Sequence, residues 1–118
     1  MNDTDNMLSL LAKLTPPDDK TVARKIADDF RKRRIEKDMT REMVALKSGV
    51  ALANIVRFER TAQISLKNLI GLAYALGYTV EIQNIFATPK FDTMEELTQI
   101  RRNMGKTKAY GKRKKIQK

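Results

Sequence analysis

Hydrophobic residues recur at helical spacing through much of the first 77 residues. One stripe predicts a helix from about residue 19 to residue 37, and it consists of Ala23, Ile26, Ala27 and Phe30. A second and more apolar stripe runs from Leu66 to Leu76, between a capping Ser65 and a terminating Gly77. This pattern predicts a second helix that forms the buried centre of the domain.

Residues 39–59 predict two short helices joined at a glycine. Thr40 can cap the first helix, because its hydroxyl can accept a hydrogen bond from an otherwise unpaired amide of the first turn. Gly49 follows where a positive φ angle would end that helix. The second helix is expected to start near residue 51 and to bury Ile55 and Phe58. Two helices of this size, joined in this way, form a helix-turn-helix that fits a DNA major groove.

Beyond Gly77 the hydrophobic period changes from 3.6 to 2. Val80 and Ile82 alternate with polar residues, as in a half-buried strand. A lone strand leaves its backbone amides and carbonyls unpaired, so pairing with the same strand of a second copy is the economical arrangement. We therefore expect residues 78–86 to be a dimerisation strand; the alternative is an extended arm that lies on its own domain.

The two ends of the chain lie outside this domain. Residues 1–20 form an N-terminal extension with a short helix, carried by Met7, Leu8, Leu11 and Leu14. That helix either covers the core or binds a partner. Residues 87–118 begin with a short helix, in which Thr93 and Glu96 have the spacing of a capping box. A basic tail follows and is expected to be disordered, either as an arm on DNA phosphates or as a solvated tail.

Charge points to a polyanionic partner. The chain has 24 Lys and Arg against 14 Asp and Glu, a formal net charge of +10 and a pI near 10.0. Nine of the basic residues and none of the acids fall in residues 101–118, which leaves only +1 for the first 100 residues. The folded part must therefore bind DNA through locally placed basic groups.

Composition argues against an enzyme. The chain has no cysteine and no histidine, so it lacks thiolate ligands and the commonest general base and metal ligand. Its adjacent carboxylates, such as those of Asp28 and Asp29, fit solvated helix faces. We expect no catalytic residues, no metal and no cofactor. The sequence also lacks a membrane-spanning apolar run and a secretory signal, which predicts a cytoplasmic protein.

Residues 22–77 resemble the Xre/Cro-type, lambda-repressor-like DNA-binding domain, with its five helices. The resemblance is carried by the register of the glycine, capping and core positions across this region. A narrower resemblance, to HipB-like antitoxins encoded beside HipA-type kinase toxins, rests on short segments: Leu14-Thr15-Pro16-Pro17, Arg33-Arg34, Ser48-Gly49-Val50, Leu52-Ala53, Arg57-Phe58-Glu59-Arg60-Thr61 and Ser65-Leu66. The expected fold is all-α: a five-helix domain over residues 21–77 with an added dimerisation strand and basic tail.

The resemblance implies roles for individual residues. The outward face of the third helix of the domain would enter the major groove with Leu52, Ala53, Asn54 and Arg57. Arg57 could contact guanine through two hydrogen bonds, Asn54 could pair with adenine or hold a phosphate, and the two apolar residues could contact thymine methyls. Contacts to the DNA backbone are assigned to Arg41, Arg60, Thr61, Gln63, Lys67 and Asn68. Arg34 would pair with Glu59 as a structural ion pair.

Two positions depart from the family pattern. Ala51 stands where the family has a capping serine or threonine, and Ala62 stands where the narrower group has a glycine. The geometry of the loop after the third helix is therefore less constrained by the resemblance than the helix-turn-helix itself.

Together these features predict a homodimeric transcriptional repressor at the nucleoid. Two copies would read an inverted-repeat operator in double-stranded DNA, in major grooves about 34 Å apart. Under the narrower resemblance the protein would be an antitoxin that represses its own toxin-antitoxin operon and binds a HipA-like kinase toxin. The alternative is a protein-interaction module that neutralises a partner and whose helix-turn-helix is only structural.

Overall fold

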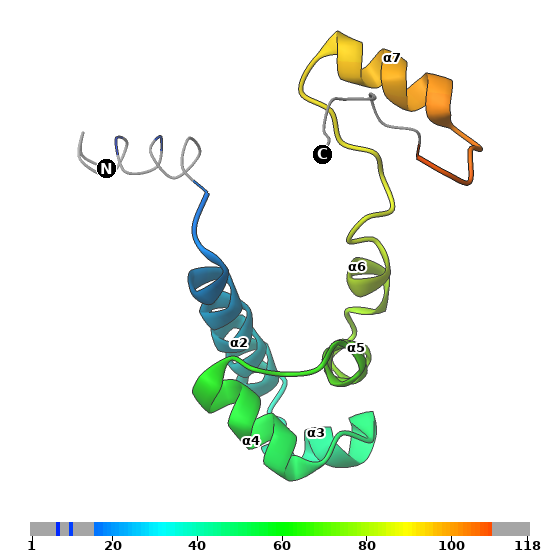
Figure 1. Cartoon of the computed structure of the whole chain (residues 1–118). Helices are drawn as coiled ribbons and strands as arrows, with labels where there is room; N and C mark the ends of the chain where they lie inside the picture. The colour runs from blue at the N-terminus through cyan, green and yellow to red at the C-terminus, as the bar shows by residue number, and fades with distance from the viewer. Residues whose placement is uncertain (1–6, 8–9, 11–15, 110–118) are drawn as a thin grey trace, which may run out of the picture. The chain divides into compact units, whose positions relative to one another are not determined.

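The computed structural model describes Met7, Leu10 and residues 16–109. Apart from the helical Met7 and Leu10, the helices of this part of the chain are α2 (Asp19–Glu36), α3 (Arg41–Ser48), α4 (Leu52–Thr61), α5 (Leu66–Ala75), α6 (Thr79–Gln83) and α7 (Met94–Asn103) (Figure 1). The chain divides into two compact units between Ile82 and Gln83. The all-helical class predicted for the domain is confirmed.

Helix α2 follows the predicted range closely. Asp18 caps it, since its Oδ1 accepts a hydrogen bond of 2.8 Å from the Thr21 amide. Of the predicted apolar stripe, Ala27 and Phe30 are buried, whereas Ile26 is 44% exposed. The core therefore takes a narrower face of α2 than the hydrophobic pattern indicates.

Helices α3 and α4 form the predicted helix-turn-helix. The Thr40 hydroxyl accepts a hydrogen bond of 3.1 Å from the Met43 amide at the start of α3. Gly49 ends that helix with a φ of 75°, a conformation that suits a residue without a Cβ. Ala51 precedes α4 and supplies no side-chain cap, as expected from its methyl group.

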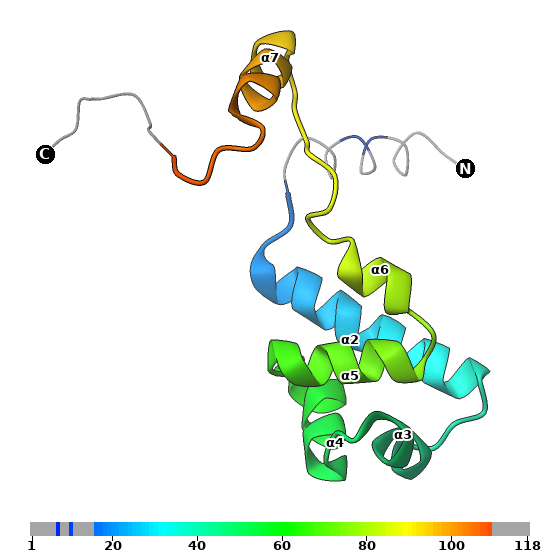
Figure 2. The same ribbon diagram turned by 90° about the vertical axis from the view of Figure 1, so that its right-hand side faces the viewer.

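Helices α2 to α5 share one hydrophobic core. α3 packs against both α4 and α5, and α2 packs against α4; Figure 2 shows α3 and α4 meeting below α5. The buried apolar residues are Ala27, Phe30, Val44, Val50, Ile55, Phe58, Leu72, Ala75 and Leu76. The core thus fixes α4 through one face and leaves the opposite face to solvent.

Gly71 allows α5 to approach the turn of the helix-turn-helix. A Cβ atom at this position would lie 3.1 Å from Cγ2 of Val50 and 3.3 Å from the carbonyl oxygen of Ser48. Both distances are tighter than ordinary van der Waals contact. A glycine inside a helix usually weakens it, so its value here lies in close packing.

The prediction of α5 as a buried helix is only half right. Leu72, Ala75 and Leu76 are buried at its C-terminal half, but Leu66 is 66% exposed and Tyr74 is 49% exposed. Sequence apolarity cannot distinguish the two sides of a helix when both sides carry apolar residues.

The predicted strand over residues 78–86 is wrong, because Thr79–Gln83 forms the short helix α6. The Tyr78 amide bonds to the carbonyl oxygen of Ala73, and the Ile82 amide bonds to that of Tyr78, so these groups are satisfied within the chain. Val80 is 66% exposed and Ile82 is partly buried. The described residues contain no strand, so Val80 and Ile82 offer no strand edge through which two copies could pair, as the dimerisation prediction required.

In the second unit, the predicted short helix is α7. The Thr93 hydroxyl accepts a hydrogen bond of 3.1 Å from the Glu96 amide, as a capping residue should. The Glu96 carboxylate, however, accepts from the amide of Asp92 rather than from that of Thr93. Leu8, Leu11, Leu14 and the tail beyond residue 109 lie outside the described residues, so the expectations for them stay predictions.

Replacing Ala62 with glycine is expected to raise the free energy of unfolding by about 0.5–1 kcal/mol. Ala62 ends α4 with a φ of 60°. This left-handed conformation destabilises a non-glycine residue by about 1–2 kcal/mol, and glycine relieves that strain. Glycine also has more conformational freedom in the unfolded chain, which offsets part of the stabilisation. Urea denaturation would measure the change. Ala53→Gly, inside α4, is the matched control and should lower the same free energy; stabilisation by both or by neither variant would contradict the strain at position 62.

Candidate nucleic-acid interface

The outward face of α4 is exposed along its length. Its predicted base-reading residues Leu52, Ala53, Asn54 and Arg57 are all exposed, while Ile55 and Phe58 point into the core. This division follows from the helical period of 3.6, which places residues three and four apart on the same face. Exposure is a condition for reading bases, and the contacts themselves remain a prediction.

Val56 belongs to the same face but is absent from the predicted set. It follows Leu52 by one helical turn and is 41% exposed. The spacing of four residues from Leu52 is the signal that could have found it. The outward face is therefore more apolar than the predicted set indicates.

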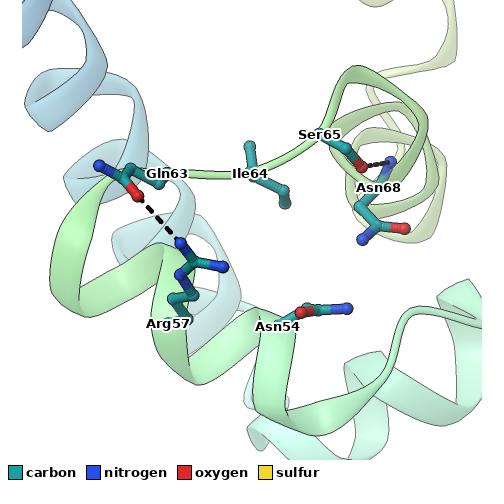
Figure 3. A pocket seen from close by; sticks show the side chains of 6 residues that line it. All are labelled: Asn54, Arg57, Gln63, Ile64, Ser65 and Asn68. Atoms are coloured by element: carbon teal, nitrogen blue, oxygen red, sulfur yellow. Dashed lines mark hydrogen bonds between the residues drawn. The ribbon is translucent and has the colours of Figure 1, made fainter.

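Asn54 and Arg57 line a polar depression of about 340 Å³ at the edge of α4 (Figure 3). Its other walls come from the loop after α4 and from the first turn of α5, and they consist of Gln63, Ile64, Ser65 and Asn68. The depression thus brings two predicted base readers together with Gln63 and Asn68, which were predicted to contact the DNA backbone.

Hydrogen bonds tie the end of α4 to the following loop. Arg57 Nη2 donates to Gln63 Oε1 over 3.1 Å, and the Thr61 hydroxyl donates to the carbonyl oxygen of Arg57 over 2.7 Å. The backbone amide of Gln63 donates to Thr61 Oγ1 over 3.3 Å. Arg57, predicted to read bases, therefore forms one connected group with Thr61 and Gln63, which were predicted to contact the DNA backbone.

The start of α5 faces the same depression. Ser65 caps the helix, since its Oγ accepts a hydrogen bond of 3.1 Å from the Asn68 amide. Lys67 is exposed in the first turn, and Arg60 is exposed near the end of α4. A helix N-terminus carries partial positive charge, so two side-chain charges and one helix end could attract phosphates at this edge.

The predicted pair of Arg34 and Glu59 is present and is part of a larger cluster. Arg34 Nε lies 2.8 Å from Glu59 Oε2, and Arg34 Nη2 lies 3.1 Å from Oε1. Arg34 Nη1 also donates to the carbonyl oxygen of Met39. The Arg34 and Glu59 side chains are only 8% and 4% exposed, so the pair is buried between α2 and α4.

Arg41 is the third member of this cluster. Its Nε donates to Glu59 Oε1 over 2.9 Å, a contact that the sequence did not reveal. Its side chain is 42% exposed, so part of it still faces solvent. The contact to DNA phosphate remains a prediction, but Arg41 also holds the start of α3 against the end of α4.

The two arginines set the ionisation of Glu59. Burial alone would raise the pKa of its carboxyl group, but the hydrogen bonds from Arg34 and Arg41, together with their positive charges, outweigh burial and lower that pKa. Glu59 therefore stays ionised in the folded domain at neutral pH.

Arg24 binds the C-terminal end of α4, the same end that carries Glu59. Its guanidinium donates to the carbonyl oxygens of Glu59 and Arg60, over 2.6 Å and 3.1 Å, and to Asp28 over 3.1 Å. Carbonyls in the last turn of a helix lack partners within the helix, so a cation there is favourable. The sequence gives no spacing rule that connects Arg24 with residues 35 and 36 positions away, and the contact went unpredicted.

Residues 16–109, with Met7 and Leu10, contain no group of three or more Asp, Glu, His or Cys side chains suited to holding a metal ion. No helix in this part of the chain has both the length and the apolarity to cross a membrane.

Comparison with known proteins gave one match. Searches of curated proteins and of solved structures returned no significant relative. The helix-turn-helix family model matches residues 30–83, a range that begins within α2 and ends with α6. The match covers the broad family and does not extend to the narrower HipB-like group. Residues 30–83 are therefore similar to helix-turn-helix domains of the Xre/lambda-repressor-like kind.

Proposed function

We propose that the protein is a sequence-specific DNA-binding transcription regulator that inserts α4 into the major groove. The observation that carries this proposal is the outward face of α4, which the core leaves exposed and which Asn54 and Arg57 border. The helix-turn-helix match over residues 30–83 supports the same function. An α-helix fits the major groove, where each base pair presents a distinct pattern of donors and acceptors.

The exposed residues divide into two groups. Arg57 and Asn54 can read bases through hydrogen bonds, and the apolar Leu52, Ala53 and Val56 suit thymine methyl groups. Phosphate contacts from Arg41, Arg60, Lys67 and Asn68 would set the register of α4 without reading sequence. The net charge of +10 adds attraction to any DNA.

A homodimer on an inverted repeat is the form in which this site would act as a repressor. One good contact through two hydrogen bonds contributes roughly 1–3 kcal/mol of discrimination, which is little for a single copy. Two copies, with their α4 helices about 34 Å apart, would read two half-sites. The two copies would not join through a strand at residues 79–83, because these residues form the helix α6.

Arg57→Ala is expected to weaken binding to the selected operator by roughly 1–3 kcal/mol per half-site, with little change on unrelated DNA. The operator would first be selected from a pool of random duplexes and then footprinted at several salt concentrations. Lys67→Ala is the matched control: loss of one phosphate contact should weaken binding to all sequences and make the salt dependence shallower.

Two results would refute the DNA-binding proposal. One is equal affinity of the wild-type protein for all sequences. The other is unchanged DNA affinity in Arg57→Ala together with retained binding to a protein partner, which would favour the alternative of an interaction module.

A narrower role as an antitoxin is proposed on the sequence resemblance alone. In this role the protein would repress its own operon and hold a HipA-like kinase inactive. Expression of the native operon with a tag on this chain tests the partner: a kinase that copurifies in fixed stoichiometry is expected. Absence of a kinase gene beside this one would remove the antitoxin role and leave the DNA-binding proposal intact.

A further inference from the structure

Arg57, Thr61 and Gln63 form a closed ring of hydrogen bonds at the end of α4. Side chains close one side of the ring, where Arg57 Nη2 donates to Gln63 Oε1 over 3.1 Å (Figure 3). The Thr61 hydroxyl completes the ring, because it accepts a hydrogen bond from the backbone amide of Gln63 and donates one to the carbonyl oxygen of Arg57. The guanidinium of Arg57 is thus tied to its own helix through the following loop.

The loop geometry makes this ring possible. Ala62 has a φ of 60° and turns the chain sharply at the end of α4. Gln63 consequently follows a left-handed residue, and its side chain lies beside Arg57, which is six positions earlier. Arg57 and Gln63 both line the depression beside Asn54.

We propose that Gln63 is a positioning residue for Arg57 and thereby determines the base preference of the protein at one base pair in each half-site. This inference rests on the proposed function of α4 as a DNA-reading helix. The sequence assigned Gln63 to the DNA backbone, where it would add affinity without sequence preference. The hydrogen bond to Arg57 gives it a different role.

The hydrogen-bonding inventory permits this role. A guanidinium has five N–H donors and no acceptor. One donor is used by Gln63 Oε1, and four remain, so two can still reach O6 and N7 of a guanine. The Gln63 side-chain amide keeps its own two N–H donors for a phosphate or base acceptor.

Positioning has a physical benefit for an exposed arginine. A long, solvated side chain loses conformational freedom when it binds, and that loss weakens the contact. A guanidinium held in place before binding loses less, and it also presents its donors in a fixed direction. A fixed direction favours guanine over bases whose acceptors lie elsewhere.

The test is a selection from duplexes with random sequence, followed by affinity measurements in which each selected position is changed in turn. The wild type and the variants Arg57→Ala, Gln63→Ala, Gln63→Glu and Lys67→Ala are compared, and their melting temperatures are measured to establish that each is folded. The base pair that loses its preference in Arg57→Ala identifies the position that Arg57 reads.

We expect the wild type to prefer guanine at that position by roughly 5- to 150-fold. Gln63→Ala should lower this preference at least threefold and leave preferences at other positions unchanged. Gln63→Glu should keep the preference, because a carboxylate accepts the same hydrogen bond, although its charge should weaken binding to all sequences. Lys67→Ala should weaken binding to all DNA sequences equally and leave every base preference unchanged. In the double variant of Arg57→Ala with Gln63→Ala, the preference at this position should match that of Arg57→Ala alone.

Two outcomes separate the failures. Uniform weakening in Gln63→Ala, with the guanine preference intact, would overturn the positioning role and leave Gln63 as a backbone contact. If Arg57→Ala keeps every base preference of the wild type, or if the wild type itself has none, Arg57 does not read a base. Either result would overturn its reading role and the positioning role of Gln63 with it.

Discussion

Glu59→Ala is expected to lower the free energy of unfolding by about 3–5 kcal/mol, which is the usual effect of removing one partner of a buried ion pair. The Glu59 side chain is 4% exposed and binds Arg34, which is 8% exposed. Its removal leaves the Arg34 charge buried with only the Met39 carbonyl as a hydrogen-bond partner. It also releases Arg41 from α4. Urea denaturation, followed by circular dichroism, would measure the loss.

Glu36→Ala is the control for a surface ion pair. Glu36 bonds to Arg33 at a distance of 2.8 Å, similar to that of the buried pair, but the two side chains are 60% and 41% exposed. An exposed pair contributes about 0–1 kcal/mol, so this variant should be nearly as stable as the wild type. Equal losses in the two variants, or a loss below about 1 kcal/mol in Glu59→Ala, would contradict the role assigned to burial.

The same cluster should give the domain an acid-sensitive component of stability. The folded pKa of Glu59 is lowered, so folding favours the ionised carboxylate. This contribution is complete above the unfolded pKa of glutamate, about 4.3, and is lost as the pH falls from there through the lower folded pKa. Glu59→Gln, which cannot ionise, should lack this part of the pH dependence; an unchanged acid profile would count against the cluster.

Local chemistry explains why the helix-turn-helix could be predicted from the sequence. Thr40 caps α3 and Gly49 ends it, and both effects depend on residues within a few positions. Ile55 and Phe58 are three apart in a helix, so their burial on one side predicts which residues face outward. That pattern predicts the outward position of the candidate base readers, although it also includes Val56, and the family resemblance implies their base-reading role.

Contacts that depend on tertiary geometry could not be predicted in this way. The bonds from Arg24 to the end of α4 and from Arg41 to Glu59 join residues at least 18 positions apart, and no periodicity links them. The ring of Arg57 and Gln63 depends on a positive φ at an alanine, which residue type alone does not favour. At residues 78–86 a local pattern was misread. Alternation of apolar and polar residues over so few positions also fits one helical turn, and α6 satisfies its amides locally.

Phe58→Ala is expected to lower the free energy of unfolding by about 3–5 kcal/mol and to remove DNA binding with the fold. The Phe58 side chain is 2% exposed, and its ring centre lies 5.5 Å from that of Phe30 at an interplanar angle of 51°. Truncation would leave a cavity between α2 and α4, the contact that holds the outward face of α4 in place. Val56 lies on the outward face of the same helix and is 41% exposed, so Val56→Ala should change the free energy of unfolding by less than about 0.5 kcal/mol. Urea denaturation of both variants tests this, and similar losses at the two positions would mean that the core does not divide α4 as described.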